Sequence, residues 1–113
     1  MIGSRDIGTG TGLLLEPFEV AGLRLRNRIV MPPMGTGLPD HDGFVTDETI
    51  AYYRRRAEGG VGMIVIEASL VSPDAYGVGP ELRLHDERAI PGLQRLARAV
   101  QDEGVPVGVQ LWH

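Results

Sequence analysis

Small and polar residues follow three apolar segments of the sequence, at positions 33–37, 67–69 and 110–113. In parallel α/β proteins, ligands gather where the strands end. Gly35 and Ala68 would let a flat ring approach the backbone. The Gln110 amide can both donate and accept hydrogen bonds at the edge of a heterocycle. These residue types therefore indicate a site for a planar heterocyclic ligand.

Other side chains could act as a general base, a metal ligand or a nucleophile, but the residues around them support these roles less. Glu67 is a candidate general base, although a structural hydrogen-bonding role is favoured for a single carboxylate at a strand end. The three histidines, His41, His85 and His113, lack the spacing of a metal site. The absence of cysteine excludes thiolate ligands and a cysteine nucleophile in this sequence. We therefore predict no metal site and leave the catalytic residues unknown.

Composition narrows the class of protein. Eleven Lys and Arg against 15 Asp and Glu give a net charge of −4, which argues against nucleic-acid binding. No apolar run approaches the ~20 residues of a membrane span. Residues 1–12 lack the apolar core of a signal peptide and are expected to form a flexible leader. The lack of disulfides fits a cytoplasmic protein.

The elements that must position the candidate site alternate between strand and helix. A β-hairpin is expected with its turn at Ala21 and Gly22. Compact apolar runs then predict strands at 28–31 and 61–68, and apolar residues at helical spacing predict a helix from the N-cap Thr46 to the glycines at 59–60 and another from 86–91 to 104. A loop is expected at 69–85 and a last strand at 105–112. Such alternation implies parallel strands in an α/β fold.

The length of the chain limits how complete this fold is. Two and a half β/α units can belong to an open sheet or to a barrel, and a complete (β/α)8 barrel needs ~250 residues. Three parallel strands alone would leave sheet edges uncovered. We expect residues 13–113 to be the truncated N-terminal part of a larger domain.

Several short motifs occur in an order that is typical of one family. They are Pro17-Phe18, Asn27-Arg28, Pro33-Met34, Gly43 with Val45 and Thr46, Tyr52-Tyr53, Arg56-Ala57, the glycine-rich 59–62, and Gln110-Leu111-Trp112-His113. From about Leu15 onward the sequence resembles the old yellow enzyme, or NADH:flavin oxidoreductase, family. Residues 34–38 are most similar to the 2-enoate and 2,4-dienoyl-CoA reductase branch, with Gly35 in place of a histidine.

The resemblance implies an FMN-binding (β/α)8 TIM barrel whose hairpin forms a lid at the N-terminal end. By position, Pro33, Met34, Gly35, Ala68 and Gln110 match the flavin-contacting strand ends of the family. The implied reaction is hydride transfer from NAD(P)H to flavin and then to an activated alkene, a small-molecule substrate. The resemblance is also compatible with a homo-oligomer.

The sequence departs from the family pattern in places. Gly35 stands where many members have Thr or Cys beside the flavin, so no side chain can tune the flavin there. The branch's iron–sulfur cluster and FAD, the substrate-binding His/Asn pair and the proton-donating Tyr would all lie downstream. We therefore expect the fragment alone to be inactive. Two alternatives remain, a non-catalytic half-barrel scaffold and a phosphate-binding barrel without flavin.

Overall fold

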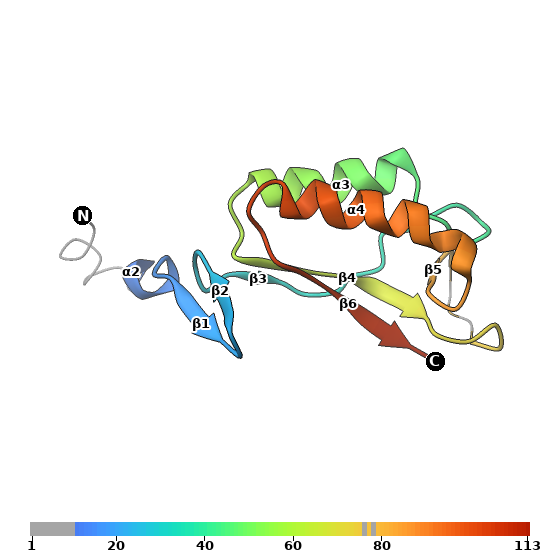
Figure 1. The fold of residues 1–113 in the computed structure, drawn as a ribbon, viewed down its shortest axis with the longest axis horizontal. Coiled ribbons are helices and arrows are strands. Elements are labelled where there is room, and N and C mark those ends of the chain that lie inside the picture. Colours follow the sequence, from blue (N-terminus) through green and yellow to red (C-terminus); the bar gives the residue numbers. More distant parts are fainter. Residues whose placement is uncertain (1–10, 76, 78) are drawn as a thin grey trace.

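The computed structural model describes residues 11–75, 77 and 79–113. Within these residues a short helix, α2 (Thr11–Leu14), precedes a β-hairpin, and strands then alternate with two longer helices (Figure 1). The leader expected over 1–12 lies mostly outside the described residues. The hairpin lies at one end of the molecule, and the C-terminal end of the last strand points the opposite way (Figure 1).

The hairpin consists of β1 (Phe18–Val20) and β2 (Leu23–Leu25), which are antiparallel. Ala21 and Gly22 both have positive φ, 50° and 80°, as the two-residue turns that match strand twist require. The predicted hairpin is therefore confirmed, together with its turn.

Side-chain hydrogen bonds hold the hairpin at the end of the sheet where the strands begin. Arg26 Nη2 donates to the carbonyl of Glu103, just after the second long helix, at 2.6 Å. Asn27 Nδ2 donates to the carbonyl of Gly60, just after the first, at 2.7 Å. The hairpin thus lies opposite to the strand ends on which the candidate site depends.

The main sheet is parallel and is centred on β4 (Met63–Leu70). Along one edge β4 pairs with β3 (Val30–Met31) and, farther on, with the short β5 (Leu82–Arg83). Along the other edge it pairs with β6 (Val107–Trp112). The order β3-β4-β6 follows the chain, with one long helix in each connection, as the sequence pattern predicted.

Both long helices, α3 (Asp47–Glu58) and α4 (Ile90–Gln101), lie side by side on one face of the sheet (Figure 1). The N-cap prediction for Thr46 is confirmed, because its hydroxyl accepts from the amide of Thr49 in a capping box. A 3₁₀ turn, Glu87–Ala89, leads into α4. Of the two glycines predicted to end α3, Gly60 alone is left-handed, with φ 94°.

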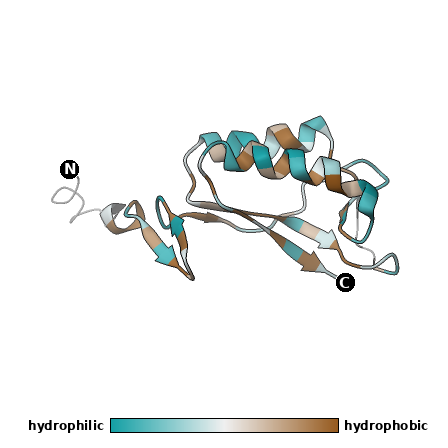
Figure 2. Cartoon of the chain, in the orientation of Figure 1, coloured by the Kyte–Doolittle hydropathy of each residue, from teal (hydrophilic) through white to brown (hydrophobic). Residues whose placement is uncertain are grey.

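The core lies between the sheet and the helices. Hydrophilic and hydrophobic residues alternate around both helices (Figure 2), which is the amphipathic pattern of helices that cover a sheet. The buried residues include Ile50, Tyr53 and Ala57 from α3, Ile64 and Ile66 from β4, and Leu96 and Val100 from α4. The predicted apolar face of α3 is thus confirmed.

The observed strands differ from the predicted ones at their ends. The strand predicted over 61–68 runs to Leu70, because Ser69 and Leu70 pair with β5 on one side and β6 on the other. The segment predicted as a loop over 69–85 therefore contains strand residues at its start and the whole of β5. No helix in the described residues is long and apolar enough to cross a membrane.

Candidate functional site

The structure brings the three predicted strand ends together. Met31 pairs with Ile64, which sets β3 beside β4. In the β4–β6 ladder Ile66 pairs with Val109 and Ser69 pairs with Leu111. Two residues of β4, Glu67 and Ala68, therefore lie opposite the single residue Gln110, in the manner of a β-bulge.

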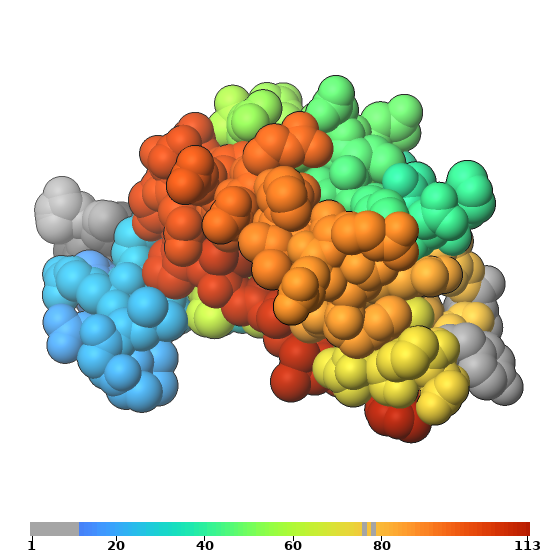
Figure 3. Space-filling model, turned by 45° about the vertical axis from the view of Figure 1, so that its right-hand side comes forward, coloured from blue at the N-terminus to red at the C-terminus, as the bar shows by residue number. Residues whose placement is uncertain are grey.

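The last residues of the neighbouring strands also stay close beyond the bulge. Val71 N donates to the carbonyl of Trp112 at 3.1 Å. In Figure 3 the end of β6, in red, emerges beside the yellow segment that follows β4. The strand ends thus form one continuous rim at the C-terminal side of the sheet.

The candidate contact residues line this rim with small or accessible groups. Pro33 and Ala68 are half-buried, whereas Gly35 and Gln110 are exposed, and Met34 is 48% exposed. A Cβ placed on Gly35 would meet no atom within 4 Å. A planar ligand could therefore approach the backbone at Gly35, and Gln110 is accessible to solvent.

Gln110 lies on the sheet face that the helices do not cover. Its neighbour Val109 shares a groove with Ile66 and with Leu93 and Leu96 of α4, so Val109 is on the helix side. Because successive side chains of a strand point to opposite faces, Gln110 points away from the helices. A ligand at Gln110 would lie over the open face of the sheet.

Glu67 is a buried carboxylate, 1% exposed, and is the one charged residue of the mostly apolar strand β4. The amide of Thr36 donates to Oε2 of Glu67 at 2.8 Å. The Thr36 hydroxyl lies 2.8 Å from Oε1 and 3.0 Å from Oε2. Glu67 therefore connects the segment after β3 to β4, the structural hydrogen-bonding role that the sequence favoured.

Tyr53 supports the same strand from the helix layer. Its hydroxyl oxygen accepts from Glu67 N at 3.1 Å, and the side chain is fully buried. Burial, together with the charge of the Glu67 carboxylate, raises the pKa of Tyr53 well above its ordinary value. Tyr53 therefore stays protonated at neutral pH, and the prediction that it is a core residue is confirmed.

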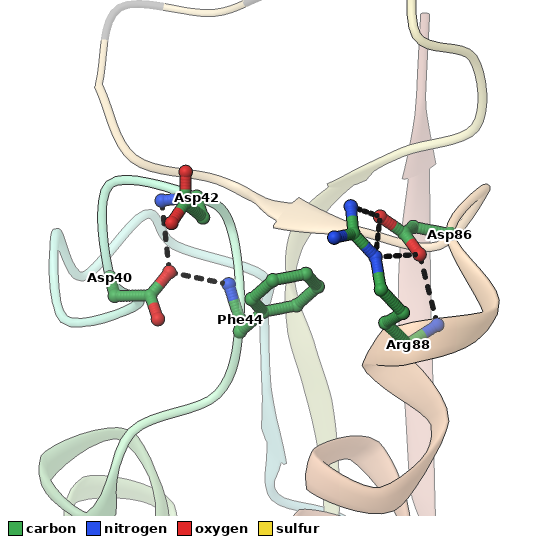
Figure 4. Close-up of polar contacts among 5 residues, drawn as sticks. All are labelled: Asp40, Asp42, Phe44, Asp86 and Arg88. Carbon is green, nitrogen blue, oxygen red and sulfur yellow. Dashed lines mark hydrogen bonds and ion pairs between the residues drawn. The ribbon is translucent and has the colours of Figure 1, made fainter.

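Two loops meet at this end of the sheet (Figure 4). Asp40 Oδ1 accepts from the amides of Asp42 and Phe44, both at 2.9 Å, which closes the loop before α3. Arg88 forms an ion pair with Asp86 at 2.7 Å, and its guanidinium lies 5.5 Å from the centre of the Phe44 ring. The loop before α3 and the turn before α4 therefore pack together.

His41 and His85 lie in loops, and His113 directly follows β6. His41 is solvent-exposed in the loop before α3, with Nε2 3.7 Å from Asp42. His85 is half-buried and His113 is exposed. Among the described residues no three His, Cys, Asp or Glu side chains are grouped as metal ligands.

Sequence reasoning missed Thr36 as a partner of Glu67. The available signal was the acidic residue directly after the apolar run at 63–66, because a buried carboxylate requires hydrogen-bond donors. The sequence gives no sign of which donor satisfies it, because Thr36 is 31 positions away. The bulge opposite Gln110 also has no glycine or proline to mark it.

The comparisons with known proteins agree on one family. The family model described as NADH:flavin oxidoreductase / NADH oxidase matches residues 13–113. A metal reductase of Desulforamulus reducens is 45% identical over an alignment of 102 residues, and the match covers 88% of this chain and 15% of the relative. An NADH oxidase of Thermoanaerobacter brockii is 43% identical over 101 residues, 88% of this chain and 16% of that protein.

Solved structures of old yellow enzymes share the fold over most of this chain. The old yellow enzyme homologue from Zymomonas mobilis superposes with a TM-score of 0.82 at 28% identity, covering 88% of this chain and 28% of that one. The chain thus spans less than a third of the length of these relatives.

Proposed function

The chain belongs to the NADH:flavin oxidoreductase / NADH oxidase family and forms part of its (β/α)8 barrel, and from this we propose that its strand ends hold FMN. The contacts proposed are Pro33, Met34 and Gly35 after β3, Ala68 on β4 and Gln110 on β6. Since the chain spans only part of its relatives, the activity proposed is that of the complete protein.

One observation supports this proposal above the others, namely that the three strand ends adjoin along one rim. Thr36 bonds to Glu67, and Glu67 and Ala68 lie opposite Gln110. The residues present fit a flat heterocycle, because the backbone at Gly35 is open and no side chain there would obstruct a ring. Met34 offers an exposed apolar contact beside it.

FMN, when bound, would supply the hydride chemistry between a nicotinamide and an acceptor. The contribution of this chain is orientation. The Gln110 amide would donate and accept at the polar edge of the ring, and the small Ala68 would let that ring lie close to β4. Gly35 offers backbone groups but no side-chain donor. We therefore do not propose that a hydroxyl or thiol at this position tunes the redox potential of the flavin.

The reaction proposed is NAD(P)H-driven reduction of an activated alkene. Relatives carry the names NADH oxidase, metal reductase and bilirubin reductase, which point to different electron acceptors. Assays of the proposed reaction must therefore compare several acceptors. Tyr52 and Tyr53 are not proposed as the proton donor, because both lie on α3, and the Tyr53 hydroxyl is buried in the core, where it accepts from Glu67 N. We propose that the 113-residue chain alone is inactive.

A substitution at Gln110 tests the FMN site. In the complete protein, Gln110→Leu should weaken FMN binding about tenfold, since polar groups of the cofactor lose a hydrogen-bond partner. Gln94→Leu, on the exposed side of α4, is the matched control and should leave the affinity within about twofold. The measurement is the dissociation constant of FMN from flavin fluorescence quenching.

Two results would count against the proposal. A complete protein that is colourless and does not take up added FMN would remove the flavin assignment. Equal FMN affinities for wild type, Gln110→Leu and Gln94→Leu would remove Gln110 from the site. With FMN bound, NAD(P)H consumption with an electron-poor alkene, compared with dioxygen and ferric ion, identifies the acceptor.

A further inference from the structure

The hydrogen bonds between Glu67 and Thr36 have a geometry that a contribution to fold stability alone does not explain. Both carboxylate oxygens of Glu67 are directed at one residue, which offers its amide and its hydroxyl. Burying a carboxylate costs free energy, because the charged group loses its contacts with water. A well-packed apolar side chain at the same position would often make the fold equally stable or more stable. An apolar residue at position 67 could not bind the amide and the hydroxyl of Thr36.

The bond fixes a segment that otherwise has no pairing. β3 ends at Met31, so positions 32–35 carry no sheet partners in the described ladders. Their near end is held by the pairing of β3 with β4, and their far end is held by the Thr36–Glu67 contact. The position of Gly35 relative to Ala68, the residue after Glu67, is therefore set by this contact.

Thr36 is also connected to the helix layer by a chain of hydrogen bonds. Leu38 N donates to Thr36 Oγ1 at 3.1 Å, and the hydroxyl of Thr46 donates to the carbonyl of Leu38 at 2.8 Å. Thr46 is the N-cap of α3. The segment before Gly37 is thus tied to β4, and the segment after it is tied to α3.

We propose that Glu67 and Thr36 are positioning residues that hold the 33–35 segment at the spacing FMN requires from Ala68 and Gln110. The inference rests on the proposed flavin site and goes beyond its contact residues, since neither Glu67 nor Thr36 needs to touch the cofactor. Small displacements of a bound reactant cost large factors in rate, so a fixed segment matters for hydride transfer.

Thr36 variants of the complete, FMN-loaded protein test this role. Thr36→Val removes the hydroxyl and keeps the shape, and it should weaken FMN binding about tenfold, because the loosened 33–35 segment would have to be ordered again when FMN binds. Thr36→Ser keeps the hydroxyl and should restore the affinity to within about twofold of wild type. The visible absorbance band of the bound flavin should shift in Thr36→Val and return in Thr36→Ser.

Thr49→Val is the matched control for lost stability. Thr49 is buried in the capping box of α3, and its hydroxyl lies 2.9 Å from that of Thr46 without contacting the 33–36 segment. It should lower the unfolding midpoint as much as Thr36→Val does. Its FMN affinity and flavin spectrum should stay those of wild type.

A double-mutant cycle with Glu67→Gln tests whether the two residues act through each other. If they do, Thr36→Val combined with Glu67→Gln should lose no more FMN affinity than the worse single variant. Additive losses, or FMN affinity and spectrum in Thr36→Val equal to those of Thr49→Val, would overturn the positioning role. Failure of the wild-type protein to bind FMN would instead overturn the proposed function on which this inference rests.

Discussion

Asp86 and Arg88 form a compact ion pair before α4, next to the loop that carries Phe44 (Figure 4). The side chain and the backbone amide of Arg88 both donate to Asp86, and these bonds lower the pKa of the Asp86 carboxyl from 3.8 to about 2. A carboxyl with a depressed pKa stabilises the folded state above its unfolded pKa. The contribution is therefore present above about pH 4 and is lost as the pH falls toward 2.

Removing the guanidinium tests this assignment. In Arg88→Ala the pKa of Asp86 should rise from about 2 toward 3.8, because the side-chain bonds are lost while the amide bond stays. Arg95→Ala, which removes the exposed partner of Asp47, should leave the Asp86 value unchanged. Carboxyl carbon shifts followed by NMR as a function of pH measure both. An Asp86 midpoint unaffected by Arg88→Ala would contradict the assignment.

Single residues were predictable where their role depends on near neighbours. The cap at Thr46, the turn at Ala21 and Gly22 and the core position of Tyr53 follow from local spacing, and the structure confirms them. The partner of Glu67 was not predictable, because the contact joins positions 31 apart. The flavin contacts stay predictions, supported by the adjacency of the strand ends.

Among the elements, the hairpin has a strained residue in its turn, since Ala21 is the one non-glycine residue of the described chain with a positive φ. Ala21 has a φ of 50°, a left-handed conformation in which a side chain crowds the backbone. Asparagine tolerates this conformation better than alanine and commonly precedes glycine in two-residue turns. The native turn is therefore not at its stability optimum.

Ala21→Asn should stabilise the complete protein by about 0.5 kcal/mol, because Asn-Gly suits a turn with two positive φ values. Gly22→Ala should act in the opposite direction, by about 1 kcal/mol, since its φ of 80° disfavours a Cβ. Urea unfolding measures both free energies. Destabilisation by both substitutions to a similar extent would show that turn strain does not limit the hairpin.

The type and order of the elements were predictable, and their ends were less so. Apolar periodicity indicated both long helices, because one face of each packs against the core, and a continuous apolar run indicated β4. β4 extends to Leu70 and β5 forms inside the expected loop because these residues pair with each other. Such pairing depends on tertiary contacts that a local pattern does not contain.

At the scale of the whole molecule, the sheet is covered on one face and left open elsewhere. A groove of about 240 Å³ runs between α4 and β6. It is lined by Ile66, Leu84, Leu93, Leu96, Ala97, Val107, Gly108 and Val109. Leu111 and Trp112 at the end of β6 are 66% and 45% exposed. Apolar surface of this kind and an unpaired strand edge are hazards for a protein in water.

The 113-residue chain, expressed by itself, should therefore lack a cooperative thermal transition and bind a hydrophobic dye such as ANS. The complete protein should melt in a sharp transition and bind little dye, because the groove and the edge of β6 would be covered in the barrel. Circular dichroism and dye fluorescence are the measurements. A sharp melt of the 113-residue chain with no dye bound would show that these residues fold independently.

The attachment of the hairpin also constrains the order of events during synthesis. Arg26 reaches the carbonyl of Glu103 across 77 positions of the chain. A hairpin can close within microseconds, but this one gains its bond to Gly60 only after α3 has left the ribosome and its bond to Glu103 only after α4 has done so. The first strands to be translated therefore complete their attachment to the sheet only near the end of the synthesis of this segment, and chaperones can reach them until then.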